Sequence, residues 1–440
     1  YKTWVSLLNV LDQLYIDRMG SDTPNDFINS EGVSIQYSTD YSIKESKRFF
    51  FNSSFRQKNS FSDLQTSASY PSYSQTSLKN YQITPRINEK NSLFGKNVNS
   101  NYGLDILYAD YESQRKKNKS SIPKHTYNAW QSSQSAYIQQ SITLNQKSEL
   151  GIGARLQRNS IGIGDVLNNL APNYSAWDKE HVKFLDSNFN YASNIGLNYK
   201  LTDKIKIFGR YSTGFRYPNI DDRIGGSGDT SLDLKTQTTN DYEIGSNINI
   251  KNHKLTVTSY LIDSKNELGY DSDHFENINI DSTRRFGLEF SSKSIFLKNI
   301  VFKNNLSFTK AKFTSENQGK YATSFKGMDV PLVPQFSLDT SLDIDLNKYV
   351  QFKPSLKFQD DMRMESDDEN FQDTKIPGYT IANIELLSNF NKFQLSLGIT
   401  NLLDHKYFNY AVASSSTKGV YNAYPEAGRE VYLSIKSNFW

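Results

Sequence analysis

Apolar and polar residues alternate with a period of two along most of the chain. Between Pro334 and Gln359, one parity carries Phe336, Leu338, Leu342, Ile344, Phe352, Leu356 and Phe358, and the other carries mainly Ser, Asp, Lys and Gln. Successive side chains of a β-strand point to opposite faces. This stretch therefore predicts a hairpin with one apolar and one polar face, turning at Asn347–Tyr349.

The same alternation recurs from Gly32 to the end of the chain and predicts about 17 strands of roughly 10–15 residues each. Strands of soluble sheets average about 5–6 residues, whereas a tilted strand that crosses a bilayer needs about 9–11. The length of the strands therefore indicates that the apolar face contacts lipid and not a protein core. On this interpretation the outward residues include Leu338, Leu342, Phe352, Leu356, Leu395 and Leu397, and the lumen-facing residues include Asp339, Asp343, Lys353 and Lys357.

The connections between these strands alternate between long and short. The short ones are Gln146-Lys147, Thr202-Asp203, Lys251-Asn252, Ser294–Asn299, Asn347–Tyr349 and Asn391-Lys392, and the long ones are Asn159–Leu185, Phe215–Lys235, Asn266–Ile280, Thr314–Val333, Asp361–Pro377 and Asp404–Gly428. A transmembrane barrel has short periplasmic turns and long extracellular loops, and a sandwich has no reason for this asymmetry. The sequence therefore predicts an all-β, transmembrane antiparallel β-barrel.

Bacterial single-chain barrels have an even number of strands. Counting back from the last strand, the segment before Gly32 falls on the long-loop side, so we expect an odd number of strands to lie before Tyr1. We expect one domain, the C-terminal strands of a larger barrel, over residues 32–440, present as an open arc. We expect residues 1–31 to form an extracellular loop segment and Gln57–Ser77 to be a solvated loop.

The N-terminal segment admits two interpretations. Its apolar residues fall at helical spacing, which predicts a short helix; a strand of the same barrel in another register is the alternative. The apolar residues are Trp4, Leu7, Leu8, Leu11, Leu14 and Tyr15.

Composition narrows the classes of protein. Mean hydropathy is −0.63 and no stretch is long and apolar enough for a spanning helix, which excludes a helical membrane protein. The net charge of +3 gives no reason to expect a nucleic-acid partner. The chain has no cysteine, which excludes disulfides, thiolate metal sites and cysteine nucleophiles.

Four short stretches resemble motifs of the TonB-dependent outer-membrane receptors. GFRYPN at Gly214–Asn219 resembles the family's corner G-F-R-x-P-N, and Leu234–Gly245 resembles the start of its next strand, with Thr236 and Gln237 in place of Pro-Glu. NLLDHKY at Asn401–Tyr407 and Gly428-Arg429 before Phe439 resemble the family's C-terminal motifs.

This resemblance covers roughly Gly32–Trp440. It implies a 22-stranded barrel in the outer membrane of a Gram-negative bacterium, with about 17 of those strands present here. It also implies a lumen filled by an N-terminal plug domain that this chain lacks, and energy coupling to the TonB complex through that missing segment.

Catalytic and metal chemistry find little support in the sequence. The five histidines are scattered, and neither an HExxH motif, a P-loop nor a G-x-S-x-G elbow occurs. No histidine lies between residues 215 and 245, which argues against the haem receptors of the resembled family, and four methionines without cysteine argue against copper. We expect no enzyme activity, no catalytic residue and no cofactor. Calcium remains open for the acidic runs Asp271, Asp273 and Glu276, and Asp360, Asp361, Glu365, Asp367 and Asp368.

Two functions of different classes remain. The first is a receptor-transporter for a large scarce nutrient, such as an iron–siderophore complex or cobalamin. The second is a passive or structural barrel, either a non-specific pore or an adhesin. If the chain is a receptor, the best candidate ligand site is the loop Phe215–Lys235, with Arg216, Tyr217, Asn219, Asp221, Asp222 and Arg223. The structural alternative is that Arg216 pairs with Asp221 or Asp222 only to order the loop.

Overall fold

A computed structural model describes residues 12–14, 27–65, 71–172, 183–224, 231–271, 276–280, 282–315, 324–390, 392–414 and 416–437. Its first strands are β1 (Asp12–Leu14), β2 (Phe27–Lys44), β3 (Lys47–Gln65), β4 (Pro71–Leu93), β5 (Lys96–Lys116), β6 (His125–Thr143), β7 (Ser148–Leu167), β8 (Lys183–Lys200) and β9 (Ile205–Arg216). A one-turn helix, α1 (Ile220–Ile224), follows β9.

The remaining strands are β10 (Gln237–Ile250), β11 (His253–Lys265), β12 (Glu267–Asp271), β13 (Glu276–Ile280), β14 (Thr283–Phe296), β15 (Ile300–Phe313), β16 (Phe336–Asp345), β17 (Val350–Gln359), β18 (Tyr379–Phe390), β19 (Phe393–Thr400), β20 (Phe408–Ala413), β21 (Tyr421–Pro425) and β22 (Glu430–Ser437). No helix in the described ranges is long and apolar enough to span a membrane.

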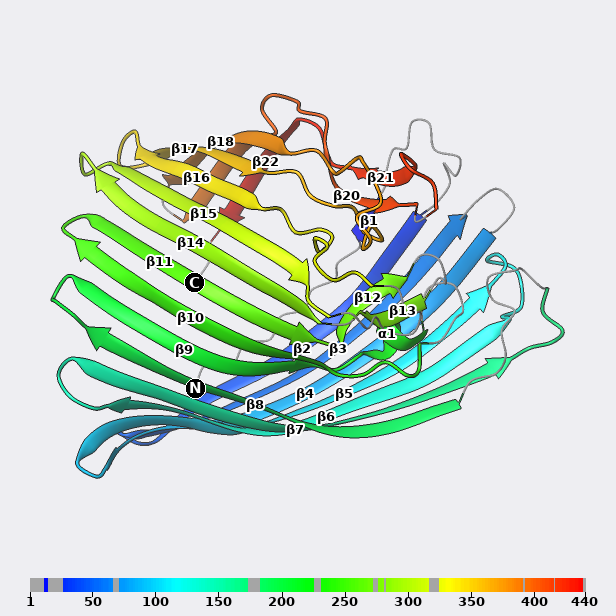
Figure 1. Cartoon of the computed structure of the whole chain (residues 1–440), viewed down its shortest axis with the longest axis horizontal. Helices are drawn as coiled ribbons and strands as arrows, with labels where there is room; N and C mark the ends of the chain where they lie inside the picture. Colours follow the sequence, from blue (N-terminus) through cyan, green and yellow to red (C-terminus); the bar gives the residue numbers. More distant parts are fainter. Residues whose placement is uncertain are drawn as a thin grey trace.

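One antiparallel sheet contains β1 and seventeen long strands, each of which pairs with its neighbour along the chain once the hairpins β12–β13 and β20–β21 are set aside. The sheet curves into a barrel wall with the short turns at one end and the long loops at the other (Figure 1). β22 pairs with β19, and β2 pairs with β1 and β3. The described strands do not close the sheet, which confirms the expected open arc.

Several boundaries differ from the expectation. β2 begins at Phe27, and Asp12–Leu14, inside the segment with helical spacing, is a strand paired with β2; the rest of that segment lies outside the described residues. The prediction of a solvated loop over Gln57–Ser77 is wrong for the described residues of that range, because β3 runs to Gln65 and β4 starts at Pro71. Strands β2–β8 contain 18 to 23 residues each, more than a bilayer requires, so polar residues extend them beyond the apolar belt.

The two parities of each strand occupy the two faces of the wall. Cross-strand partners keep the apolar parity in line, as in the row Phe352, Leu386, Leu397 and Leu433 over four adjacent strands. Leu397 is 46% exposed and Leu433 64% exposed, and no second sheet covers this face in the described part of the chain. This outward face is the one that the sequence predicts to meet lipid.

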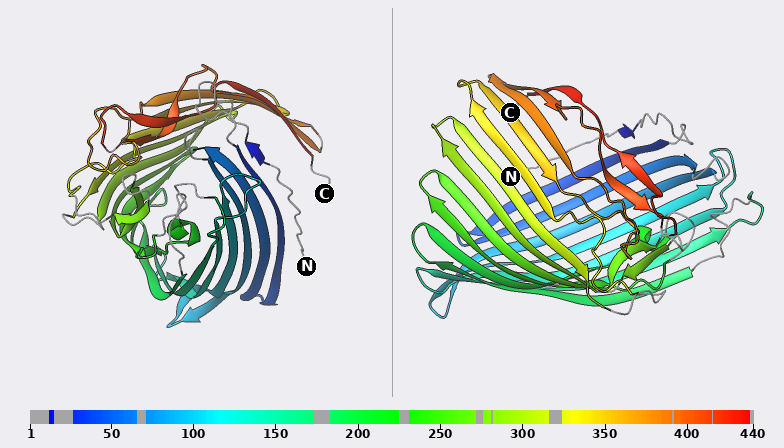
Figure 2. Two further views of the ribbon diagram at one scale, coloured as in Figure 1. Left: turned by 90° about the vertical axis from the view of Figure 1, so that its right-hand side faces the viewer. Right: turned by 45° about the horizontal axis from the view of Figure 1, so that its top comes forward.

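Some of the short turns contain residues with positive φ. At the tip between β4 and β5, Phe94 and Gly95 have φ of 51° and 72°, as a two-residue hairpin loop with the twist of its flanking strands requires. The opposite end of the wall carries the long loops instead of short turns. There α1 and the β12–β13 hairpin lie inside the curve of the sheet (Figure 2).

Candidate functional site

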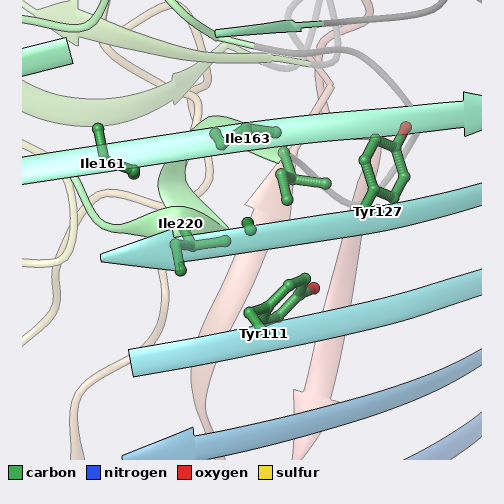
Figure 3. Close-up of a cluster of buried hydrophobic side chains, with 7 residues drawn as sticks. Tyr111, Tyr127, Ile161, Ile163 and Ile220 are labelled. Carbon is green, nitrogen blue, oxygen red and sulfur yellow. The ribbon is translucent and has the colours of Figure 1, made fainter. Parts of the chain in front are cut away.

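The loop between β9 and β10 folds inward because α1 carries two buried isoleucines. Ile220 and Ile224 pack on inward-facing residues of β5, β6 and β7, which are Tyr111, Tyr127, Ala129, Ile161 and Ile163 (Figure 3). Burying an isoleucine side chain stabilises a fold by about 1.5–3 kcal/mol. This apolar contact between α1 and the wall holds the loop, with its six candidate residues between Arg216 and Arg223, at the long-loop end of the barrel.

Asn219 and Asp222 cap α1 reciprocally. Oδ1 of Asn219 accepts the backbone N–H of Asp222, and Oδ2 of Asp222 accepts the backbone N–H of Asn219, both at 2.8 Å. These two bonds satisfy backbone donors that a helix start leaves without partners. Oδ1 of Asp222 also lies 3.0 Å from Nη2 of Arg216, the last residue of β9. Of the two carboxylates offered as partners of Arg216, the structure therefore selects Asp222.

Arg223 is a buried structural cation. It donates hydrogen bonds to the carbonyl oxygens of Leu232 and Leu234, the latter at 3.1 Å, and its guanidinium lies 4.9 Å from the ring centre of Phe184. Burial lowers the pKa of the Arg223 guanidinium, and the nearby Asp222 partly offsets this effect. With 3% of its surface exposed, Arg223 holds the loop in place and presents no surface to a ligand.

Tyr217 ties the loop to the barrel wall. Its hydroxyl donates to the carbonyl oxygens of Asn188 at 3.0 Å and of Gln157 at 3.3 Å, and its burial raises the pKa of the phenol. Arg216 remains half-exposed and Asp221 is exposed. The structure thus brings the six residues together; Arg223 is buried, and Arg216, Tyr217, Asn219, Asp221 and Asp222 retain surface on which a ligand could lie.

The sequence indicated no nutrient-binding site in the neighbouring long loops, two of which contain further strands. The long connection after β11 contains β12 and β13. Glu267 of β12 accepts hydrogen bonds from both terminal nitrogens of Arg285 on β14, from Nη2 at 2.5 Å and from Nη1 at 3.0 Å. The connection after β19 contains β20 and β21. The alternation of Ile278 and Ile280 with asparagines is a signal that could have identified β13.

The acidic runs offered for calcium are divided among other partners. Asp361 binds Lys375 at 2.7 Å and Asp367 binds Arg363 at 3.1 Å. Asp273 lies outside the described residues. Within the described ranges, no group of three or more His, Asp or Glu side chains is arranged to hold a metal ion.

A buried pair, His125 and Asp165, also lies beside the apolar contact between α1 and the wall. Nδ1 of His125 is 2.7 Å from Oδ2 of Asp165, and the His125 ring stacks on Tyr127 with 5.6 Å between ring centres. Both side chains are at most 1% exposed, so this pair is a part of the wall and not a surface for a ligand.

Comparison with known proteins identifies the family to which the chain belongs. Residues 5–402 match the family model described as TonB dependent receptor-like, beta-barrel. Among solved structures, the ferric-catecholate import receptor Fiu of E. coli K12 superposes with a TM-score of 0.73 at 15% identity, covering 93% of this chain and 64% of Fiu. The ferric yersiniabactin uptake receptor FyuA of Yersinia pestis gives 0.74 at 15% identity, with 94% and 62% covered.

The siderophore receptor PiuA of Acinetobacter baumannii gives a TM-score of 0.74 at 14% identity, covering 93% of this chain and 65% of PiuA. The chain therefore spans less than two thirds of the length of each of these structures. At such low identity the likeness shows the fold alone.

Proposed function

Because the chain belongs to the TonB-dependent receptor-like β-barrel family, we propose that it serves the energy-coupled uptake of a ferric siderophore across the outer membrane of a Gram-negative bacterium. Members of this family are transporters and not enzymes. The observation that carries the proposal is the family match over residues 5–402. The three neighbours named above, each described as a ferric-chelate or siderophore receptor, support iron over cobalamin as the cargo.

We place the ligand at the long-loop end, against the loop between β9 and β10. Arg216 offers a half-exposed guanidinium, which can bind a carboxylate or a catecholate oxygen pair through two N–H groups. Tyr217 adds an aromatic face beside Phe215, with 5.5 Å between the ring centres. Energy would reach this site through a plug domain and the TonB complex, which are the proposed partners.

Uptake of radioactive iron by iron-starved cells tests the proposal. Cells that produce the protein are supplied with ferric catecholate, ferric hydroxamate and ferric citrate chelates, with labelled cobalamin as a separate arm. We expect one ferric chelate to be taken up, and the uptake to stop when the proton gradient is collapsed. Uptake of cobalamin only, or uptake that persists without the gradient, would contradict the proposal and favour another cargo or a passive pore.

Binding of the transported chelate then tests the site. We expect Arg216→Ala and Tyr217→Ala each to weaken binding about tenfold or more, which corresponds to about 1.4 kcal/mol. Arg284→Ala is the matched control, because Arg284 pairs with Asp263 on the outward face of the wall. Asp222→Ala separates contact from scaffolding, because it removes the carboxylate that pairs with Arg216 and caps α1 but keeps the Arg216 guanidinium itself. If Asp222→Ala weakens binding as much as Arg216→Ala does, Arg216 orders the loop and does not touch the ligand.

A further inference from the structure

The short turns from β10 to β19 form a basic edge of the wall (Figure 1). Each of these turns, between β10 and β11, β14 and β15, β16 and β17, and β18 and β19, contains an exposed lysine and neither Asp nor Glu. We call these residues the lysine rim, which consists of Lys251, Lys298, Lys348 and Lys392. Within the described ranges, none of the four ammonium groups forms an ion pair with a carboxylate. The rim therefore presents four positive charges at the short-turn end.

Backbone hydrogen bonds hold these turns in a fixed order along the edge. A carbonyl oxygen of one turn accepts an N–H from the next hairpin. The donor and acceptor residues are Ile295 and Asn252 at 3.0 Å, Asp345 and Asn299 at 2.8 Å, and Asn389 and Tyr349 at 2.8 Å. The spacing of the lysine rim is therefore set by the sheet and not by contacts between side chains.

Two lysines of the rim have a backbone conformation that lysine rarely adopts. The φ angle is 52° at Lys251 and 63° at Lys298, and it is 49° at the neighbouring Leu297. Glycine adopts this left-handed conformation without cost, whereas a residue with a Cβ atom is strained there. A leucine and a lysine at such positions indicate that their side chains make contacts that offset the strain.

A large apolar side chain lies beside each lysine of the rim. Leu297 directly precedes Lys298 and is 84% exposed, and the corresponding residues of the other turns, which are 45% to 63% exposed, are Ile250, Leu346 and Phe390. These three continue the outward rows of β10, β16 and β18. Apolar side chains next to ammonium groups match the boundary between the acyl chains and the headgroups of a lipid leaflet. A water-soluble polyanion would not require the exposed apolar surface.

We propose that the lysine rim binds the phosphate groups of anionic phospholipids in the leaflet that faces the short turns. The short turns of an outer-membrane barrel lie on the periplasmic side, so this is the periplasmic leaflet. Each ammonium group pairs with a lipid phosphate, and the adjacent apolar side chain contacts the acyl chains of the same lipid. The inference concerns the wall alone and is independent of the cargo proposed above.

The lipid selectivity of the full-length receptor in vesicles tests this proposal. The receptor is reconstituted in phosphatidylcholine vesicles that contain a trace of spin-labelled phosphatidylglycerol or spin-labelled phosphatidylcholine, and the immobilised fraction of each label gives its relative affinity. We expect a preference for phosphatidylglycerol of about fivefold, the factor for one lysine contact with each bound lipid. This preference should fall as the ionic strength rises, because salt screens exposed charges.

A set of glutamine substitutions separates the rim from general surface charge. The rim variant combines Lys251→Gln, Lys298→Gln, Lys348→Gln and Lys392→Gln, and it should lower the preference to about twofold or less. Arginine at the same four positions should preserve the preference. The control combines four exposed positions at the long-loop end, Lys119→Gln, Lys326→Gln, Lys406→Gln and Lys418→Gln, and should not change it. If the rim variant keeps the full preference, or if the control lowers the preference equally, the proposal fails.

The depth of the turn in the leaflet tests the apolar contact. In Leu297→Trp, we expect the added fluorescence to be quenched by phospholipids that carry bromine close to the headgroup, and acrylamide in the water to quench it weakly. Val420→Trp is the control, because Val420 is exposed at the long-loop end, and there acrylamide should be the stronger quencher. If acrylamide quenches both variants equally, the turn lies in water and the rim does not contact lipid.

Peptidoglycan is another anionic partner on the periplasmic side. Sedimentation of the receptor with purified peptidoglycan should be the same for the parent protein and for the rim variant. If only the rim variant loses sedimentation, and its preference for phosphatidylglycerol is intact, the rim binds the cell wall and the proposal is wrong.

Discussion

The hydroxyl of Tyr260 on β11 lies 2.8 Å from Oγ1 of Thr309 on β15, although β14 runs between these two strands. The residue of β14 between them is Gly287, which pairs with both. A Cβ atom at position 287 would lie 2.2 Å from the Tyr260 ring. The ring therefore crosses β14 only because residue 287 has no side chain.

Gly287→Ala should destabilise the barrel by about 1–3 kcal/mol, because the ring of Tyr260 must move and its bond to Thr309 is lost. Gly151→Ala is the control, since a Cβ there meets nothing closer than 3.8 Å. We expect the control to leave stability unchanged or slightly higher. The free energy of unfolding in liposomes measures both; equal values for the two variants would contradict the role of Gly287.

Leu342→Arg and Asp343→Arg test the two faces of β16. Leu342 pairs with Phe302 on the outward face, where a charge near the bilayer midplane costs about 2–4 kcal/mol. Asp343→Arg removes the ion pair with Lys303, at 2.5 Å, which is worth at most about 1 kcal/mol at a partly exposed site. We expect the first variant to lower the unfolding free energy more; the reverse order would place lipid on the other face.

Asp222→Ala should loosen the start of α1. The substitution removes one half of the reciprocal cap and the partner of Arg216, and we expect a local loss of about 1–2 kcal/mol. Hydrogen exchange of the amides between Ile220 and Ile224 measures this loss. Asp221→Ala, at the exposed neighbouring position, should change it by less than about 0.5 kcal/mol. Similar exchange rates in the two variants would show that the cap does not stabilise α1.

The loop after β17 should lose stability as the pH rises. Burial, together with the smaller effect of the nearby carboxylates Asp367, Asp271, Glu365 and Glu369, raises the pKa of Asp368 to about 7. The folded loop therefore holds this proton more tightly than the unfolded chain, whose aspartates titrate near pH 4. The stabilisation is complete below about pH 4 and is lost as the pH rises towards 7.

Hydrogen exchange of residues 360–378 at pH 5 and pH 8 measures this dependence. Asp368→Asn should remove it and stabilise the loop at pH 8 by roughly 2–4 kcal/mol. Asp373→Asn is the control, because the Asp373 side chain is 85% exposed and pairs with Lys418 at the surface. A pH dependence that survives Asp368→Asn would assign the titration to another group.

The sequence by itself determined the architecture, since side-chain alternation and loop length are local properties. The period of two placed Leu342 and Leu397 on the outward face, and the alternation of turns and loops oriented the barrel. The alternation of apolar and polar residues did not predict the strands over Gln57–Ser77. A strand that extends beyond the apolar belt meets water on its outer face, so its outward residues need not be apolar.

Only the tertiary structure decided what the loop residues do. Charge and aromaticity made Arg223 and Arg216 equal candidates, yet Arg223 is buried against the Leu232–Leu234 backbone and Arg216 keeps an exposed face. The side-chain amides of Asn279 and Asn370 bind the backbone of segments more than 40 residues away. Such contacts follow from how the curved wall brings the loop ends together, and no periodicity along the chain records that arrangement.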